Sequence, residues 1–225
     1  MIALPCFVER GDTLMDRFAF RVFPAAEAVL YVSFLILDLS GHMTASIPLK
    51  YTGIILCLFA AIPSARTADG CVTSLALAFT AAADWFLLLQ NRHYMVGISL
   101  FCIVQLLYFI RLLMWRGRIC IPTFVLRLVP LLLLFSLKSK MEALALFYFS
   151  GLVCNALDAV LFSHEKQQKQ KVFAAGLSLF VFCDICVGAY NLGLLTGFTR
   201  YGMWLFYLPA QVLIARSTHL KGNCP

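Results

Sequence analysis

The feature that most constrains this chain is a succession of long apolar segments separated by short charged or turn-forming breaks. A helix needs roughly 20 apolar residues to cross the hydrocarbon core of a bilayer, because each residue rises about 1.5 Å. Eight segments have this character: 18–38, 50–62, 71–89, 95–115, 119–137, 141–162, 172–196 and 201–216. The second and the eighth reach spanning length only with their flanks. The pattern predicts an all-α, polytopic membrane helix bundle with about eight transmembrane helices.

The composition agrees with this prediction and leaves little room for a separate soluble domain. Hydrophobic residues make up 62% of the 225 positions and charged residues 13%, and the mean hydropathy is +0.88. We therefore expect a cytoplasmic or interfacial N-terminal segment over 1–17, a single transmembrane helical domain over 18–217 and a cytoplasmic tail over 218–225. The expected location is the cell membrane, as a multi-pass protein.

The basic residues are distributed as expected for membrane topology. The net charge is +7, but the lysines and arginines lie between apolar segments and do not gather in one patch, so we expect no nucleic-acid partner. Twelve of the 18 fall at segment ends on the side of the N-terminus, and five fall at the opposite ends. By the positive-inside rule, both termini are expected in the cytoplasm.

Five carboxylates lie in or at the ends of the predicted spans, namely Glu27, Asp38, Asp84, Asp158 and Asp184. A charged group at the centre of a helix in the bilayer costs roughly 2.5–3.5 kcal/mol on insertion scales, so such residues are candidates for function. Asp38 and Asp158 lie near helix ends, which favours structural roles. Asp84 and Asp184 lie deeper, on separate helices without a basic residue nearby in either helix, which favours function.

Further polar residues share helical faces with the deep carboxylates, and with Glu27 they are expected to converge on one polar pocket. These residues are Gln105, Tyr108, Asn191, Tyr207 and Gln211. Each lone amide could instead be an interhelical hydrogen-bonding contact. Arg127 could be the countercharge of a carboxylate or a ligand of a substrate phosphate.

The histidines and cysteines argue against two other kinds of site. All four histidines fall outside the predicted spans, so no intramembrane histidine and carboxylate cluster is expected to hold a catalytic metal. The cysteines lie mostly inside apolar segments, where they are expected to pack as small hydrophobic residues. We expect neither a metal nor a cofactor.

Three parts of the chain carry motifs of one family. FTAAADWFLLL followed by YMVGISLFCIVQLLYFIRLL, then AAGLSLFVFCDICVGAYN, then MWLFYLPAQVLIARS occur in order. They resemble the third and fourth, the seventh and the closing helices of the YhhN family of lysoplasmalogenase-like membrane proteins. The resemblance covers residues 75–217.

The resemblance places the family's functional positions on residues of this chain. The two aspartates fall on Asp84 and Asp184, and the other matched positions are Tyr108, Tyr207 and Gln211. The chain departs from the family pattern at three positions, where Ala83 replaces a glycine, Gln105 a histidine and Cys183 a serine. A glutamine cannot shuttle protons as a histidine can.

Family members of known activity hydrolyse the vinyl ether bond of lysoplasmalogens to a fatty aldehyde and glycerophosphocholine or glycerophosphoethanolamine. The resemblance thus implies an ether hydrolase that acts on a lysophospholipid in the bilayer, with Asp84 and Asp184 as acid and base. The residues expected to orient water or substrate are Gln105, Tyr108, Tyr207, Gln211, Asn191 and Glu27. The alternatives are a lipid-binding or transporting bundle of the same family and a degenerate member with a structural or regulatory role.

Overall fold

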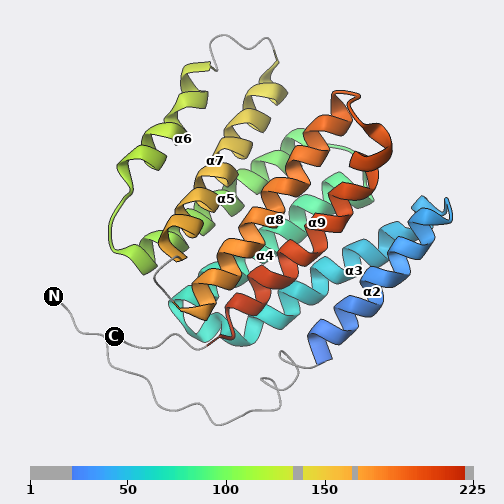
Figure 1. The fold of residues 1–225 in the computed structure, drawn as a ribbon, viewed down its shortest axis with the longest axis horizontal. Helices are drawn as coiled ribbons and strands as arrows, with labels where there is room; N and C mark the ends of the chain where they lie inside the picture. Colours follow the sequence, from blue (N-terminus) through green and yellow to red (C-terminus); the bar gives the residue numbers. More distant parts are fainter. Residues whose placement is uncertain (1–21, 134–138, 164–166, 221–225) are drawn as a thin grey trace.

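The structure, a computed structural model, describes residues 22–133, 139–163 and 167–220. These residues form eight α-helices joined by short connections, which confirms the all-α class (Figure 1). In chain order the helices are α2 (Phe23–Leu39), α3 (Met43–Ala61), α4 (Ala68–Asp84), α5 (Tyr94–Arg116), α6 (Ile121–Leu133), α7 (Lys140–Ser163), α8 (Gln168–Asn191) and α9 (Thr196–Ser217). The predicted segment 1–17, and residues 221–225 of the predicted tail 218–225, lie outside the described residues.

Five stretches of helix are long and apolar enough to cross a membrane: Met43–Arg66, Ala68–Leu89, Tyr94–Arg116, Lys140–Phe162 and Gln168–Asn191. They support a multi-pass integral membrane protein. Within the described residues, the helices α2, α6 and α9 are too short or not apolar enough to be counted with these five. Eight spans, and the orientation of the termini, remain predictions.

The second helix begins at Met43, because residues 43–49 continue as regular helix through Pro48, so the predicted segment 50–62 extends into its N-terminal flank as expected. Two boundaries near the last turn were wrong, namely the predicted end of the seventh helix at residue 196 and the predicted start of the eighth at residue 201. The seventh helix ends at Asn191, ahead of the predicted end at residue 196. The chain turns there through Gly193 and Leu195, which both have positive φ angles, and the last helix then begins at Thr196.

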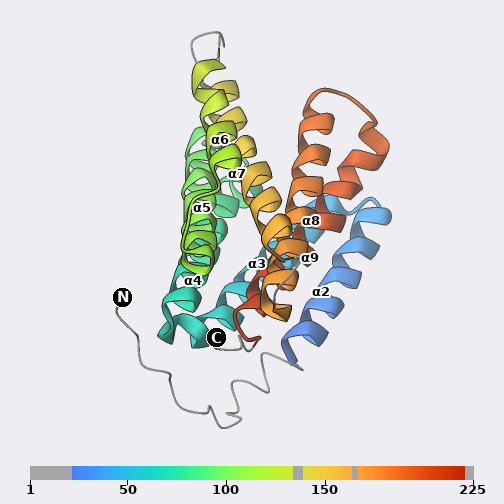
Figure 2. The same ribbon diagram turned by 60° about the vertical axis from the view of Figure 1, so that its left-hand side comes forward.

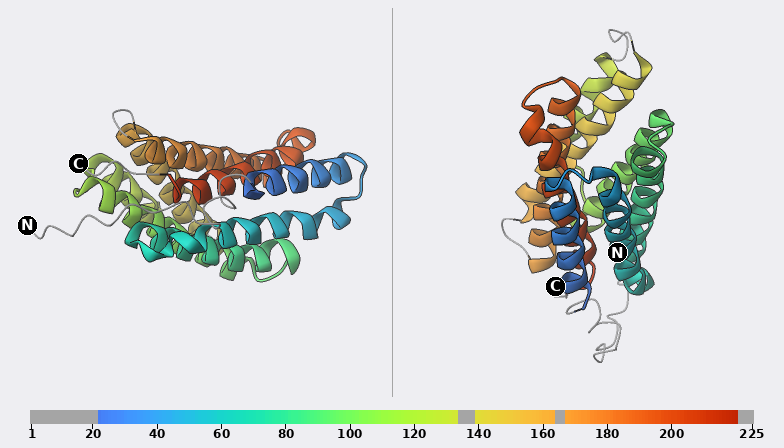
Figure 3. Two further views of the ribbon diagram at one scale, coloured as in Figure 1. Left: turned by 90° about the horizontal axis from the view of Figure 1, so that it is seen from below. Right: turned by 90° about the vertical axis from the view of Figure 1, so that its right-hand side faces the viewer.

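The helices pack side by side in an elongated bundle. The helix α9 packs against α8, α3, α4 and α2, and in Figure 3 it lies between α8 and the α3–α4 pair. On the other side, α5 packs against α4 and α7, and α6 packs against α7. Figure 2 shows α6 at one margin of the bundle and α2 at the other. The bundle therefore brings α4, α5, α7, α8 and α9 around one interior.

Small residues allow α8 and α9 to approach closely. A Cβ atom added to Gly176 of α8 would lie 3.1 Å from the carbonyl oxygen of Ala210 and 2.9 Å from Cγ1 of Ile214. Helix pairs in lipid associate largely through such close backbone contacts. The absence of a side chain at Gly176 thus sets the spacing of this helix pair.

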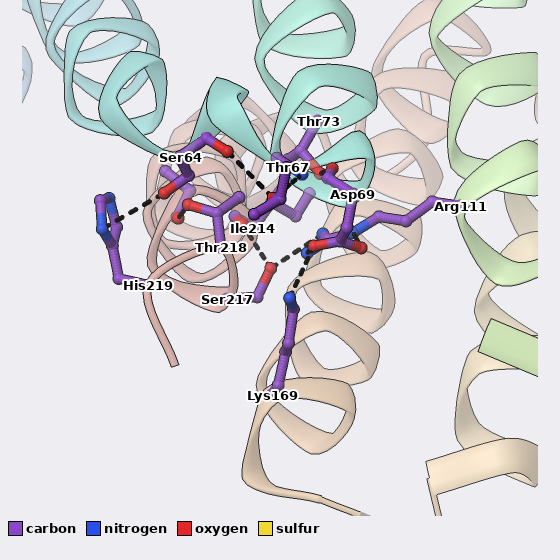
Figure 4. Close-up of polar contacts among 12 residues, drawn as sticks. Ser64, Thr67, Asp69, Thr73, Arg111, Lys169, Ile214, Ser217, Thr218 and His219 are labelled. Carbon is purple, nitrogen blue, oxygen red and sulfur yellow. Dashed lines mark hydrogen bonds and ion pairs between the residues drawn. The ribbon is translucent and has the colours of Figure 1, made fainter. Parts of the chain in front are cut away.

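One end of the bundle is held together by a buried arginine (Figure 4). Arg111 of α5 is fully buried, and its Nε donates to Oδ1 of Asp69 over 2.9 Å while its Nη1 donates to Oγ of Ser217 over 2.9 Å. Nζ of Lys169 lies 2.7 Å from the other oxygen of Asp69. The guanidinium of Arg111 also lies 4.4 Å from the centroid of the Phe173 ring. This network joins α4, α5, α8 and α9.

The two carboxylates expected to have structural roles are both in buried ion pairs. Asp38 accepts from Nζ of Lys50 over 2.7 Å and from Oγ of Ser46 over 2.5 Å. Asp158 of α7 accepts from Arg116 and from Arg127, each over 2.9 Å. Arg127 is therefore the countercharge of a carboxylate, one of the two possibilities that the sequence left open.

Candidate active site

Asp84 is the last residue of α4 and is buried. Its Oδ2 accepts a hydrogen bond from the hydroxyl of Tyr207 on α9. A π-helical turn, Trp85–Leu89, follows at once; such turns occur frequently at functional sites. The Trp85 ring packs against Tyr51 of α3, with 5.9 Å between the centroids. Asp84 therefore lies where α3, α4 and α9 meet.

Asp184 lies in α8, two turns before the C-terminal end of the helix. The Tyr148 side chain on α7 lies within interaction range of its carboxylate. Its Oδ2 is shielded from solvent and has no hydrogen-bond partner among the described residues. The carboxylate thus keeps one oxygen available for a bound molecule.

The two aspartates lie within electrostatic range of each other. Cys183, next to Asp184 in the chain, also lies within range of both carboxylates. The structure therefore brings together residues 100 positions apart in the sequence, on α4 and α8, as the shared-pocket hypothesis requires.

A row of aromatic rings connects the tyrosines that hold the two aspartates. The Tyr148 ring lies 5.5 Å from Phe101, Phe101 lies 5.9 Å from Phe180, and Phe180 lies 5.4 Å from Tyr207, measured between centroids. Phe101, Phe180 and Tyr207 are buried. This aromatic wall, formed by Tyr148, Phe101, Phe180 and Tyr207, makes the surroundings of the carboxyls apolar.

Glu27 of α2 is also buried but lies beside other residues. Its Oε1 accepts from the thiol of Cys57 over 3.5 Å, and its Oε2 has no hydrogen-bond partner among the described residues. A Cβ atom added to Gly53 would lie 3.1 Å from this Oε2. The hydroxyl of Tyr108 on α5 faces Thr80, with Cys57 nearby. Since Thr80 is one turn before Asp84, this second group of buried polar residues lies next to the first.

Gln211 follows Tyr207 by one turn of α9 and is completely buried. Neither its Nε2 nor its Oε1 has a hydrogen-bond partner among the described residues. Most buried side-chain polar atoms in proteins are paired, so a fully unpaired amide calls for an explanation, of which a functional role is one. Its position on the Tyr207 face of α9 agrees with contact to a bound polar molecule.

Two predicted site residues have different surroundings. Nδ2 of Asn155 donates to Oε1 of Gln105 over 3.0 Å and to its carbonyl oxygen over 2.8 Å, so Gln105 joins α5 to α7. This is the interhelical contact that the sequence offered as an alternative role. Asn191 is exposed at the end of α8, two turns beyond Asp184. It does not share the buried pocket.

The sequence analysis missed Tyr148. This residue lies in the predicted span 141–162, seven residues before Asn155, and the two share one helical face. A search for polar residues at this spacing would have found it.

The described residues also contain no group of three or more histidine, cysteine, aspartate or glutamate side chains that could hold a metal ion.

Comparison with known protein families shows that the family model described as the YhhN family matches residues 46–218. The matched range begins within α3 and ends just after α9, so it contains both aspartates and both of their tyrosine partners but not Glu27. Curated proteins and solved structures gave no match.

Proposed function

Because the chain belongs to the YhhN family, which includes lysoplasmalogenases, we propose that it hydrolyses the vinyl ether bond of lysoplasmalogens within the membrane. The products are a fatty aldehyde and glycerophosphocholine or glycerophosphoethanolamine. The observation that carries the proposal is the pair of aspartates, Asp84 and Asp184, which lie within electrostatic range of each other and each have a tyrosine beside them, Tyr207 and Tyr148.

Vinyl ether hydrolysis needs two proton transfers in opposite directions. An acid protonates the alkene carbon remote from the ether oxygen, which leaves an oxocarbenium ion at the other alkene carbon. A water molecule attacks that carbon while a base removes a proton from the water, and the product is a hemiacetal. A base then takes the hydroxyl proton of the hemiacetal, and an acid protonates the glycerol oxygen. The bond between this oxygen and the former alkene carbon breaks, which gives aldehyde and alcohol. General acid and base catalysis of this kind accelerates reactions by typically 10²–10⁴-fold.

The two aspartates suit these roles because they can hold different protonation states. In its protonated form, one carboxyl donates the proton. The other, ionised, accepts the proton of the attacking water. Tyr207 holds the carboxyl of Asp84 by a hydrogen bond, and Tyr148 lies within interaction range of the carboxyl of Asp184. When the hemiacetal separates, the carboxyl that became ionised takes the hydroxyl proton, and the carboxyl that became protonated gives its proton to the glycerol oxygen. Both carboxyls thereby return to their starting states.

The aromatic wall supports the cationic intermediate. The faces of aromatic rings attract positive charge, and the attraction is stronger where water is excluded. Phe101 and Phe180 are buried between the two tyrosines, so an oxocarbenium ion formed between the aspartates would lie near them. Gln211, one turn from Tyr207, orients the attacking water or the glycerol oxygen.

The test is aldehyde release by the purified full-length protein supplied with a lysoplasmalogen in detergent micelles. We expect release by the unaltered protein and by Glu142→Gln, which changes an acidic residue in the exposed first turn of α7. Asp184→Asn should lower it by at least about 10²-fold, and unchanged release by this variant would end the proposal. If the unaltered protein released no aldehyde but carried lipid in a counterflow assay with proteoliposomes, the transporting bundle would replace the hydrolase.

A further inference from the structure

A pocket outside the buried site lies at the α8–α9 turn, at the opposite end of the bundle from the network of Figure 4. Its volume is about 640 Å³, and it is lined by Tyr190, Asn191, Thr196, Gly197, Arg200 and Tyr201. The lining supplies a guanidinium, two phenols, an amide and a hydroxyl, and it includes no carboxylate. This combination of donors suits an anion.

The charge around this pocket is positive. Lys50 of α3 lies within electrostatic range of Arg200, and its own ammonium is paired with Asp38 over 2.7 Å. The Asp38 carboxylate is therefore already neutralised, and the charge of Arg200 is in excess. A guanidinium is well suited to a phosphodiester because its planar group of donors matches two phosphate oxygens.

The pocket and the buried site lie along one face of α9. Arg200 precedes Tyr207 by seven residues, so the two side chains share a face and their Cα atoms lie about 10 Å apart along the helix. Trp204 lies between them, with its ring 5.6 Å from the Tyr207 ring and 4.7 Å from Nζ of Lys50.

This spacing corresponds to the length of a lysoplasmalogen head. Seven bonds separate the phosphorus from the far carbon of the vinyl ether, a reach of about 8 Å when extended, by comparison with the extended peptide chain. A phosphate held at Arg200 would therefore place the vinyl ether near the hydroxyl of Tyr207 and the carboxyl of Asp84.

We propose that the pocket at the α8–α9 turn binds the phosphodiester of the lysolipid head group. Arg200 is its ionic ligand, and Asn191 and the hydroxyls of Tyr190 and Tyr201 donate hydrogen bonds to it. The inference rests on the proposed function and adds to it a site for the head group. It makes the phosphate, and not the acyl or alkenyl chain alone, a determinant of substrate choice.

The experiment measures binding without turnover. Purified full-length protein in detergent is titrated with lysophosphatidylcholine, which carries the phosphate but has an ester in place of the vinyl ether, and with a monoacylglycerol, which lacks the phosphate. Arg200→Gln should weaken lysophosphatidylcholine binding about tenfold, as expected for the loss of a partly solvated charged hydrogen bond. Monoacylglycerol binding should not change.

Arg92→Gln is the matched control, because Arg92 is exposed in the α4–α5 connection at the same end of the bundle and is outside the pocket. It should bind both lipids as the unaltered protein does. Circular dichroism of both variants establishes that they are folded. Equal lysophosphatidylcholine affinity in Arg200→Gln and the unaltered protein would overturn the inference.

Competition distinguishes a lipid head group from free phosphate. Glycerophosphocholine should displace lysophosphatidylcholine in the unaltered protein at lower concentration than inorganic phosphate does, and equal displacement by phosphate would overturn the head-group assignment. The binding assay does not depend on catalysis. Phosphate-dependent binding without aldehyde release would contradict the hydrolase function and support the head-group site. Aldehyde release without an effect of Arg200→Gln on binding would support the hydrolase function and contradict the head-group site.

Discussion

The hydroxyl of Tyr207 hydrogen-bonds the carboxylate of Asp84 across 123 positions of the sequence. This contact joins the end of α4 to the middle of α9. The Tyr207 ring packs against two other aromatic rings, since the centroids of Phe180 and Trp204 lie 5.4 Å and 5.6 Å from its own. The hydroxyl and the ring of Tyr207 can therefore be tested separately.

Replacing Tyr207 with phenylalanine removes the hydrogen bond and keeps the ring contacts. A hydrogen bond to a charged group contributes about 1.5–3 kcal/mol, so we expect the rate of aldehyde release to fall by about one to two orders of magnitude with little loss of folded protein. Tyr94→Phe is the control, because the exposed Tyr94 hydroxyl donates only to the nearby Asn91 over 2.6 Å. Full activity of Tyr207→Phe would exclude a role for its hydroxyl.

The two aspartates are expected to act as one unit. Asp84→Asn and Asp184→Asn should each lower aldehyde release by at least about 10²-fold, the lower end of the contribution typical of general acid–base catalysis. The double variant should be no worse than the poorer single variant, because effects of residues that act together are not additive. Rate losses that simply multiply in single-turnover measurements would contradict a shared acid–base role.

A methyl group at Gly176 should destabilise the bundle. The added Cβ would meet the Ala210 carbonyl oxygen and the Ile214 backbone nitrogen, at 3.1 Å and 3.2 Å, and backbone atoms cannot move aside as a side chain can. Overpacking of this kind costs typically 1–3 kcal/mol, so Gly176→Ala should lower the midpoint of thermal unfolding in detergent.

Gly188→Ala is the control in the same helix, because a Cβ at Gly188 has nothing within 4 Å. It should leave the unfolding midpoint unchanged or raise it slightly, since alanine favours helix over glycine. Equal losses in both variants would show that the α8–α9 contact is not tight at Gly176.

Removing Arg111 should destabilise the end of the bundle shown in Figure 4. Arg111→Met leaves the buried Ser217 hydroxyl without its donor and Asp69 with Lys169 alone. Breaking a buried ion pair costs about 3–5 kcal/mol, and we expect a loss of that order in unfolding by denaturant. Arg216→Met changes an exposed arginine in the last turn of α9 and should have little effect; equal losses would contradict a structural role for the network.

Much of the candidate site could be predicted from helical periodicity. Asp84, Asp184 and Tyr207 stood out because carboxylates and hydroxyls are unfavourable in apolar segments, and the structure brings the three together. Periodicity was less informative for Gln105, since a lone amide suits either an interhelical contact or a substrate, and only its partner Asn155 distinguishes the two. Asn191 shared a face with Asp184 in projection, but α8 ends there and exposes it.

Sequence patterns were enough to predict a bundle of apolar helices, to place most of these helices, and to single out Glu27, Asp38, Asp84 and Asp158 as carboxylates that the bundle buries. Hydrocarbon allows only backbone that satisfies its own hydrogen bonds, and it penalises each charge strongly enough to mark it in the sequence. Only the packing of the helices shows which of them are neighbours, that Tyr148 lies beside Asp184, and that Arg127 pairs with Asp158. Those pairings depend on the rotation and spacing of whole helices, which are set by contacts such as Gly176 against Ala210 between residues distant in the chain.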